Sequence, residues 1–192
     1  MYWQVLSPDT YADVPWKNGQ GRTLELCAQA HAEGRSNLWR VSMATVAMNG
    51  AFSDFSGYTR TLLLSAGQGM TLHYHGASDD VLSERFAAAH FDGGCGTSAT
   101  LHGGAITDLN VMTKTGYCSA KVLTLGAQQA HVIDVDTDWL LLLPFDNAVD
   151  VCAESFSKQT LGAMHLLKVT QPARAPWRVQ GGPVVCIQIQ LD

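Results

Sequence analysis

The stretch Trp39-Arg40-Val41-Ser42-Met43-Ala44 alternates large apolar residues with polar or small ones, and the same alternation returns in Val185-Cys186-Ile187-Gln188-Ile189. Successive side chains of a β-strand point to opposite faces of a sheet, so a period of two residues indicates half-buried strands. Short apolar runs bounded by Gly, Pro, Asn and Asp fill most of the remaining chain. Only residues 81–90 have the alanine content of a helix turn or two. The sequence therefore predicts an all-β protein with little helix.

A weak internal repeat indicates two similar halves. Shifting residue 59 onto residue 137 aligns Thr59–Leu64 with Thr137–Leu142, and it places Trp39 over Tyr117. Leucine-rich strands align easily, so coincidence is the alternative. The same shift replaces Arg60 by Asp138, and a polar site at Arg60 need not be duplicated. We expect two domains, residues 1–114 and residues 115–192, packed as one unit.

Composition excludes several classes of protein. The 192 residues are 46% hydrophobic and 15% charged, which is typical of a globular chain and not of a disordered one. A net charge of -5 with 12 scattered Lys and Arg residues disfavours nucleic-acid binding. No apolar run approaches a membrane span and no secretory leader is recognisable, so we expect a cytoplasmic protein with no membrane partner. The low charge content favours self-association, for example as a homodimer.

The cysteine pattern gives no covalent framework. Five cysteines, an odd number, lack the Cys-x-x-Cys spacing of a zinc ribbon or a redox pair. We therefore expect reduced, buried thiols rather than disulfides.

The segment Pro15–Leu26 contains a glycine-rich loop that resembles a binding site. Trp16, Lys17, Asn18 and Gly19 combine a flat apolar ring, a cation and an amide with a backbone that can adopt positive φ. A tight turn between two strands is the alternative, because Asn-Gly is a strong hairpin signal.

Alternation also predicts a polar cavity. Arg40 and Ser42 share one strand face, Arg60 shares a face with leucines, and Asp108 shares a face with Asn110. If these faces line one barrel, two guanidinium groups meet an amide and a carboxylate in apolar surroundings. A guanidinium matches a carboxylate in two parallel hydrogen bonds, so the set suits a small anion. The alternative is that Arg40 or Arg60 pairs with Asp54 or Asp108 for structural reasons alone.

Four segments, Pro15–Leu26, Trp39–Ala44, Gly50–Arg60 and Asp108–Met112, follow one another as they do in the HutD/Ves family of bicupins, which the chain resembles from about Trp3 to Met112. The resemblance implies two cupin-like β-barrels of the RmlC-like jelly-roll type, with a pocket in the first and no established reaction. It leans toward the stress-associated Ves-like branch rather than the HutD branch of histidine metabolism. Gln20 stands where the family usually has another glycine, which puts the approach of this loop to a ligand in doubt.

His73-Tyr74-His75 favours a metal hypothesis, because two histidines at i and i+2 resemble the first cupin motif. That motif adds a glutamate a few residues later, whereas the nearest here is Glu84. We therefore expect surface histidines and no metal.

These observations lead to one function hypothesis and two alternatives. We interpret the chain as a non-catalytic or weakly catalytic bicupin that binds a small carboxylate metabolite, without a cofactor, in a sensing or regulatory role in stress response or histidine metabolism. The alternatives are a metal-dependent cupin enzyme that uses His73 and His75, and a structural or partner-binding β protein. No nucleophile elbow, P-loop or dinucleotide fingerprint is present. The expected ligand-binding residues are Trp16, Lys17, Asn18, Gly19, Trp39, Arg40, Ser42, Arg60, Asp108 and Asn110.

Overall fold

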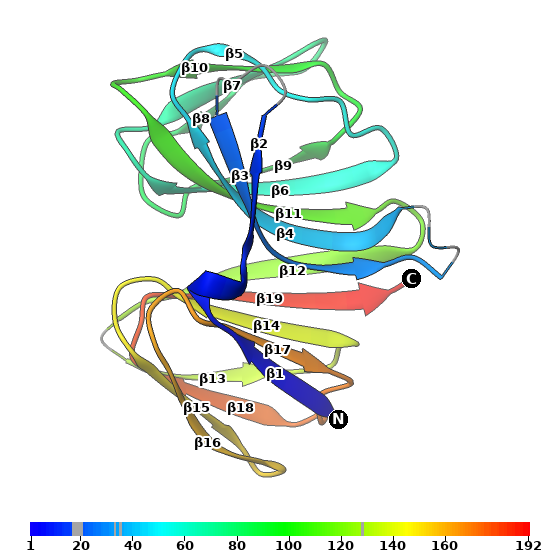
Figure 1. Ribbon diagram of the computed structural model, residues 1–192, viewed down its shortest axis with the longest axis vertical. Coiled ribbons are helices and arrows are strands. Elements are labelled where there is room, and N and C mark those ends of the chain that lie inside the picture. Colours follow the sequence, from blue (N-terminus) through cyan, green and yellow to red (C-terminus); the bar gives the residue numbers. More distant parts are fainter. Residues whose placement is uncertain (17–20, 33, 35, 128) are drawn as a thin grey trace. The chain divides into compact units, whose positions relative to one another are not determined.

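A computed structural model describes residues 1–16, 21–32, 34, 36–127 and 129–192. The described residues form strands, with one short 3-10 helix at Pro8–Thr10 (Figure 1). They divide into two compact units, Tyr11–Cys118 and a second made of Met1–Thr10 with Ser119–Asp192. The prediction of an all-β chain is confirmed.

The unit Tyr11–Cys118 contains two antiparallel sheets that share one apolar core. The larger sheet has the strand order β2-β3-β4-β11-β6-β9, and the smaller has the order β5-β10-β7-β8. Core side chains come from both sheets, for example Leu62 and Leu64 from the first and Leu72 from the second. The strands are β2 (Ala12–Pro15), β3 (Gly21–Ala30), β4 (Asn37–Val46), β5 (Gly50–Ala51), β6 (Tyr58–Ala66), β7 (Met70–Tyr74), β8 (Asp80–Leu82), β9 (Ala88–Asp92), β10 (Thr97–Leu101) and β11 (Ile106–Lys114).

The second unit repeats this arrangement with the sheets β1-β17-β14-β19-β12 and β13-β18-β15-β16. Its core is apolar throughout, and Leu140, Leu142 and Trp177 are buried in it. The strands are β1 (Tyr2–Leu6), β12 (Cys118–Leu125), β13 (Ala130–Asp134), β14 (Trp139–Pro144), β15 (Val149–Ala153), β16 (Phe156–Leu161), β17 (Leu166–Thr170), β18 (Pro176–Gln180) and β19 (Val184–Leu191).

The two units have the same strand order. The orders β4-β11-β6-β9 and β5-β10-β7-β8 become β12-β19-β14-β17 and β13-β18-β15-β16 when each strand number is raised by eight. The repeat that aligned Thr59–Leu64 with Thr137–Leu142 therefore matches β6 with β14, which hold equivalent places. No strand pairing among the described residues joins the two sheets of a unit, so each barrel is an open two-sheet sandwich.

The register of β4, β11 and β6, which run side by side (Figure 1), positions the polar residues. Arg40 and Arg60 both lie opposite Met112, and Ser42 lies opposite Asn110. Asp108 lies opposite Leu64, whose side chain belongs to the core. These side chains therefore share the face that points into the unit's interior.

Two expectations differ from the structure. Residues 81–90 form the end of β8, a turn and the start of β9 instead of a helix, because Ala88–Asp92 pairs with β6 and buries every second side chain. Alanine's helix propensity is small compared with this pairing. The first ten residues were assigned to the N-terminal domain, but β1 pairs with β17 of the second unit.

The five cysteines are thiols that form no disulfide with one another; Cys118 and Cys186 are buried and the other three are half-buried. No helix among the described residues is long and apolar enough to cross a membrane.

Candidate functional site

A buried chain of hydrogen bonds joins β6 to β11; its members are Arg60, Asn110 and Asp108, and we call it the polar string. Nη2 of Arg60 donates a hydrogen bond to Oδ1 of Asn110 at 2.6 Å, and Nδ2 of Asn110 donates to Oδ1 of Asp108. Arg60 is 4% exposed and Asp108 is 0% exposed, so both ionisable groups lie away from water. Asn110 is therefore the bridge between a buried cation and a buried acid.

Aromatic rings surround the guanidinium group of Arg60. Its Cζ lies 5.2 Å from the ring centroid of Phe52, 5.4 Å from that of Phe55 and 5.1 Å from that of Phe91. These rings offer a cation their negative faces but no hydrogen-bond acceptor. Burial lowers the pKa of Arg60 to about 10, against the opposing effect of Asp108, so the side chain stays cationic at neutral pH.

Asp108 has an unusually high pKa for a carboxyl group. Burial raises the pKa of Asp108 to about 7, although Arg60 and the hydrogen bond from Asn110 act in the opposite direction. Near neutral pH this group therefore exchanges between its neutral and charged forms.

Two atoms of the string have no hydrogen-bond partner. Nε of Arg60 and Oδ2 of Asp108 are both buried, and no hydrogen bond reaches either within the part of the chain that the structure describes. A buried donor on a charged group that lacks an acceptor costs about 1–3 kcal/mol or more. The Nε–H of Arg60 is therefore a buried donor that is open to an acceptor, although Nη2 of the same group is satisfied by Asn110.

A cavity of about 170 Å³ is lined by neighbours of Arg60, although Arg60 itself does not line it. Two of its lining residues also touch the surroundings of Arg60: Phe55, whose ring faces the guanidinium, and Met112, which pairs with Arg60 across the sheet. Nε of Arg40, also in the lining, donates to Oε2 of Glu25 at 2.6 Å. The complete lining is Glu25, Asn37, Arg40, Phe55, Tyr58 and Met112.

The structure brings together five of the expected binding residues, Arg40, Ser42, Arg60, Asp108 and Asn110, on one face of the sheet. Trp16 packs against the same core, and its indole nitrogen donates to the hydroxyl of Thr23 at 2.8 Å. Trp39 is fully buried but lies on the opposite face from Arg40, so it is not a wall of this cavity. Lys17, Asn18 and Gly19 lie outside the described residues.

The sequence leaves open a purely structural pairing of Arg40 or Arg60 with Asp54 or Asp108, and the structure shows other partners for these residues. Arg40 pairs with Glu25, and Asp54 accepts hydrogen bonds from the backbone and hydroxyl of Ser56. Arg60 reaches Asp108 through Asn110 rather than by direct contact.

The histidines singled out from the sequence lie elsewhere. His73 shares a strand with the core residues Leu72 and Tyr74 but points to the outer face. Its ring nitrogens lie 2.7 Å from Oδ2 of Asp79 and 2.9 Å from the hydroxyl of Thr100. The described residues contain no cluster of three or more His, Cys, Asp or Glu side chains suited to a metal ion. That no metal binds stays a prediction.

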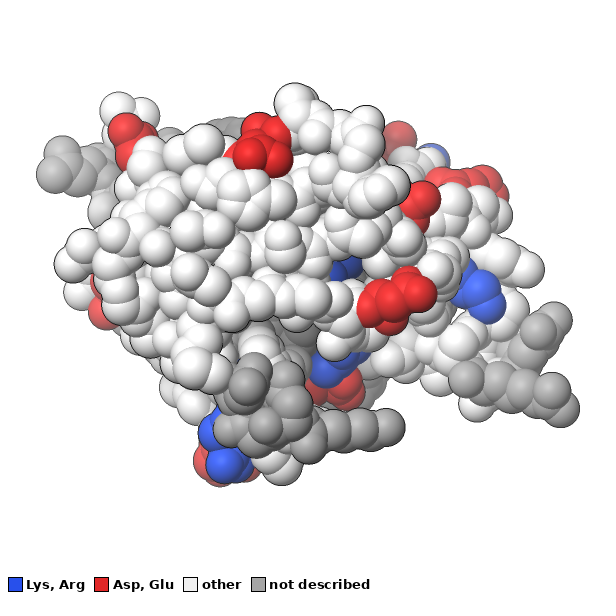
Figure 2. Space-filling model, turned by 90° about the horizontal axis from the view of Figure 1, so that it is seen from above, with Lys and Arg blue, Asp and Glu red and all other residues white. Residues whose placement is uncertain are grey.

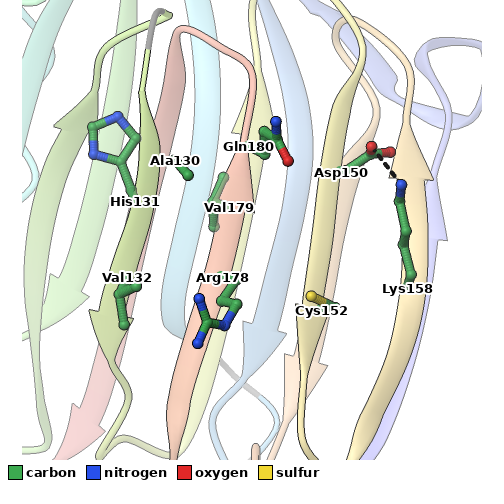
Figure 3. Close-up of a pocket in the computed structure, with 9 residues that line it drawn as sticks. All are labelled: Ala130, His131, Val132, Asp150, Cys152, Lys158, Arg178, Val179 and Gln180. Carbon is green, nitrogen blue, oxygen red and sulfur yellow. Dashed lines mark ion pairs between the residues drawn. The ribbon is translucent and has the colours of Figure 1, made fainter.

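A second hollow, of about 190 Å³, lies on the outer face of the sheet β13-β18-β15-β16 (Figure 3). Val132, Arg178 and Cys152 occupy one row across its strands. At one side Nζ of Lys158 lies 2.8 Å from Oδ2 of Asp150. The side chains of Arg178 and Lys158 are exposed, and water can satisfy them, unlike Arg60.

Charged side chains are few and scattered over the face in Figure 2, where the described residues form no continuous basic area. That face offers no track for a phosphate backbone.

Sequence reasoning missed the aromatic surroundings and Glu25. Phe52 and Phe55 belong to the segment Gly50–Arg60 that was already singled out, so their closeness to Arg60 in sequence was an available signal. Phe91 and Glu25 reach the site only through the registers β6 with β9 and β3 with β4.

Comparison with known proteins explains the shared architecture. The family model HutD matches residues 8–187 of the chain. The chain belongs to the HutD family.

Relatives in this family include an uncharacterised 21.2 kDa protein in the hutC 3' region of Pseudomonas putida, which is 34% identical over 67% of this chain and 75% of the relative. Protein Ves of Citrobacter koseri is 35% identical over 66% of this chain and 69% of the relative. The two identities are nearly equal and do not separate a Ves branch from a HutD branch.

Solved structures extend the similarity to the whole chain. HutD from Pseudomonas fluorescens SBW25, described as a formate condition, has a TM-score of 0.84 and 25% identity, with 100% of both chains covered. Oxalate decarboxylase from Lactobacillus farciminis in a formate complex has a TM-score of 0.66 at 7% identity, over 96% of this chain and 85% of the other, which indicates a cupin-like fold alone. The HutD family fold of this chain is thus all-β and cupin-like.

Proposed function

We propose that this member of the HutD family binds a small carboxylate metabolite through Arg60 and acts as a non-catalytic sensor or regulator. One observation carries the proposal: Arg60 is buried among three phenyl rings, and none of the described residues offers its Nε an acceptor. A carboxylate would supply the missing acceptor and could accept two parallel hydrogen bonds from the guanidinium group.

The second unit supports the proposal because it builds the same fold without this charge. Cys186 lies opposite Leu142 as Asp108 lies opposite Leu64, and Cys186 is buried. Burial raises the pKa of Cys186 to about 12, so the equivalent position holds a neutral thiol. Because the architecture does not need a buried charge there, structural pairing alone is a weak reason for Asp108 and Arg60. Replacing buried ion pairs by apolar residues is often neutral or stabilising in proteins.

The cavity restricts the size of the ligand. Its volume of about 170 Å³ is below the roughly 300 Å³ at which pockets for drug-sized molecules begin. Of the two arginines, Arg40 is held by Glu25, whereas Nε of Arg60 has no acceptor among the described residues. Formate is a suitable probe, because the Pseudomonas fluorescens HutD structure is described as a formate condition.

The name of one relative supports the physiological setting that we propose. The Pseudomonas putida relative is named for its position beside hutC, which supports a regulatory role in histidine utilisation. A cytoplasmic location and a homodimeric state remain predictions. The metal-enzyme alternative has no supporting observation, since His73 points away from the interior.

Calorimetric titration with formate tests the proposal. Arg60→Met keeps the length and apolar stem of the side chain but removes the charge-assisted hydrogen bonds, which contribute about 1.5–3 kcal/mol. We expect the dissociation constant to rise about 10-fold to 150-fold. Arg178→Met, the same change at an exposed arginine of the other unit, is the matched control and should bind formate as the parent does.

Arg60→Met also leaves Asp108 without its cation, which can destabilise the fold. The double variant Arg60→Met with Asp108→Asn removes both charges and keeps the comparison valid if the single variant unfolds. Parent-like affinity for formate in a folded Arg60→Met or double variant would contradict the proposal. Arg60, Asn110 and Asp108 would then be interpreted as a hydrogen-bonded group with a structural role only.

A further inference from the structure

Among the described residues, the charges of the polar string and of the cavity lining sum to zero before any ligand enters. Arg60 and Arg40 carry two positive charges, and Glu25 and ionised Asp108 carry two negative charges. Glu25 is committed to Arg40, while Asp108 is linked to Arg60 through Asn110. A carboxylate that binds to Arg60 would therefore leave one excess negative charge among phenyl rings and buried strands.

An uncompensated charge in such surroundings is costly, and a titratable group responds by neutralising itself. Asp108 is the group placed to respond. It is fully buried, and its Oδ2 has no partner in the described part of the chain. That oxygen can accept a proton without breaking the hydrogen bond that Asn110 donates to Oδ1.

We propose that the site takes up its carboxylate together with one proton, which is held on Oδ2 of Asp108. This inference rests on the proposed function of Arg60 and deepens it, because the ligand enters as the neutral equivalent of a carboxylic acid. The proton comes from solvent and forms an O–H bond on Asp108, while the ligand's carboxylate pairs with Arg60. No other bond changes.

Other ionisable groups around Asp108 are less suited to this role. Arg60 stays cationic at neutral pH, and the carboxylate of Glu25 is occupied by its ion pair with Arg40. Tyr74 on β7 donates its hydroxyl hydrogen to Oδ2 of Asp80 at 2.9 Å, and burial raises the pKa of Tyr74 above its usual value, so it stays neutral. Asp108 interacts directly with Arg60 on β6 and Asn110 on β11. The groups one step further away act on Arg60 or on its neighbours: Tyr74 on β7 and Arg40 on β4 act on Arg60, Glu25 on β3 pairs with Arg40, and Asp80 on β8 and Cys95 before β10 act on Tyr74.

The sign of the pH dependence follows from linkage. Below about pH 7 Asp108 is already neutral in the free protein, so formate binds without proton uptake and with constant affinity. Above about pH 7 the free protein holds Asp108 charged, and binding must add the proton. The affinity for formate should then fall by up to about tenfold for each pH unit, with uptake approaching one proton per formate.

Isothermal titration calorimetry of the full chain with formate measures this uptake. Titrations at pH 5.5 in MES and in piperazine, and at pH 8 in HEPES and in Tris, use at each pH two buffers whose ionisation enthalpies differ. The difference in heat between the two buffers gives the number of protons bound per formate. For the parent protein we expect none at pH 5.5 and nearly one at pH 8. The dissociation constant should rise between the two pH values.

Asp108→Asn should bind formate with a dissociation constant that does not change with pH, without proton uptake, and more tightly than the parent at pH 8. Glu25→Gln is the contrasting carboxylate variant: whatever it does to affinity, proton uptake at pH 8 should persist. If Asp108→Asn does not fold, the heats of the parent protein in the two buffers still decide the question.

The failures are distinguishable. Formate binding with equal affinity at both pH values and equal heat in both buffers would overturn proton uptake while leaving the proposed function in place. Proton uptake that survives in Asp108→Asn would move the proton to another group and refute the assignment. No saturable formate binding to the parent at either pH would reject the proposed function itself, and this inference with it.

Discussion

Asp108 makes the stability of the protein depend on pH in an unusual direction. Its pKa is raised from an ordinary value near 4 to about 7 in the folded chain, so the folded state binds more protons than the unfolded state between these pH values. Stability is therefore lost as pH rises from about 4 to about 7, and it is constant in this respect above that range. Acids whose pKa is lowered, such as Asp13 and Asp54, act in the opposite sense only at more acidic pH.

We predict that Asp108→Asn removes this loss. Urea unfolding at pH 5 and pH 8 measures it: the free energy of unfolding of the parent should fall between the two, while that of the variant should change less. A parent protein that is more stable at pH 8 than at pH 5, by the same margin as the variant, would contradict the assignment.

Gly21 is required by the ring of Trp16. A Cβ atom at position 21 would lie 2.8 Å from two ring carbons of Trp16 and 2.9 Å from the carbonyl oxygen of Thr45. Gly21→Ala should therefore destabilise the protein by about 1–3 kcal/mol, as overpacking does. Gly50→Ala is the matched control, because nothing lies within 4 Å of the added atom. Equal unfolding midpoints for the two variants in urea would show that Trp16 moves aside freely.

At the site, the sequence could predict which residues share a face but not which partners they find. Alternation alone placed Arg40, Ser42, Asp108 and Asn110 correctly, because the period of a strand is local. The same alternation predicts that Trp39 lies on the opposite face from Arg40, which is where the structure has it. Trp39 was expected in the site only as an apolar wall. The pairing of Arg40 with Glu25 depends on the register between β3 and β4, which no local pattern encodes.

Among the elements, β1 has a role that its position in the sequence conceals. Its five residues pair with β17, and the ring of Trp3 lies 5.4 Å from that of Phe156 in an edge-to-face arrangement. The strand thus covers an edge that would otherwise present unpaired backbone groups.

We predict that deleting residues 1–6 lowers the unfolding temperature and promotes aggregation through the exposed edge of β17. Formate affinity should be unchanged, because Arg60 belongs to the other unit. Thermal unfolding and size-exclusion chromatography measure the first effect, and calorimetry measures the second. Tyr2→Ala, at an exposed position of the same strand, is the control and should have little effect. A truncated protein with the parent's unfolding temperature would show that β1 is dispensable.

The segment 81–90 shows why composition misled the element prediction. Ala88 is exposed, Ala89 buried, His90 exposed and Phe91 buried, which is the period of a strand. Alanine content favours a helix weakly, whereas antiparallel pairing with β6 satisfies the backbone groups along one edge of Ala88–Asp92.

At the scale of the whole molecule, the short sequence repeat predicts that the two units have the same strand order. The shift that aligned Arg60 with Asp138 also aligns Asp108 with Cys186 and Asn110 with Gln188, and these pairs occupy equivalent places in β11 and β19. The fold was predictable because both halves obey the same alternation. The pairing of β1 with the second unit was not predictable, because no local sequence pattern encodes a pairing between residues 2–6 and 166–170.

The placement of β1 also matters while the ribosome is still making the protein. β1 begins at Tyr2, and its partner β17 begins at Leu166. At synthesis rates of about 5–20 residues per second, roughly 10 to 30 seconds pass between the emergence of the two strands. During this time β1, which contains Trp3 and Val5, lacks its partner strand β17. The whole of Tyr11–Cys118 leaves the exit tunnel in the same interval. Strand β1 is thus translated well before its partner β17 and is among the last strands of this sequence to be paired.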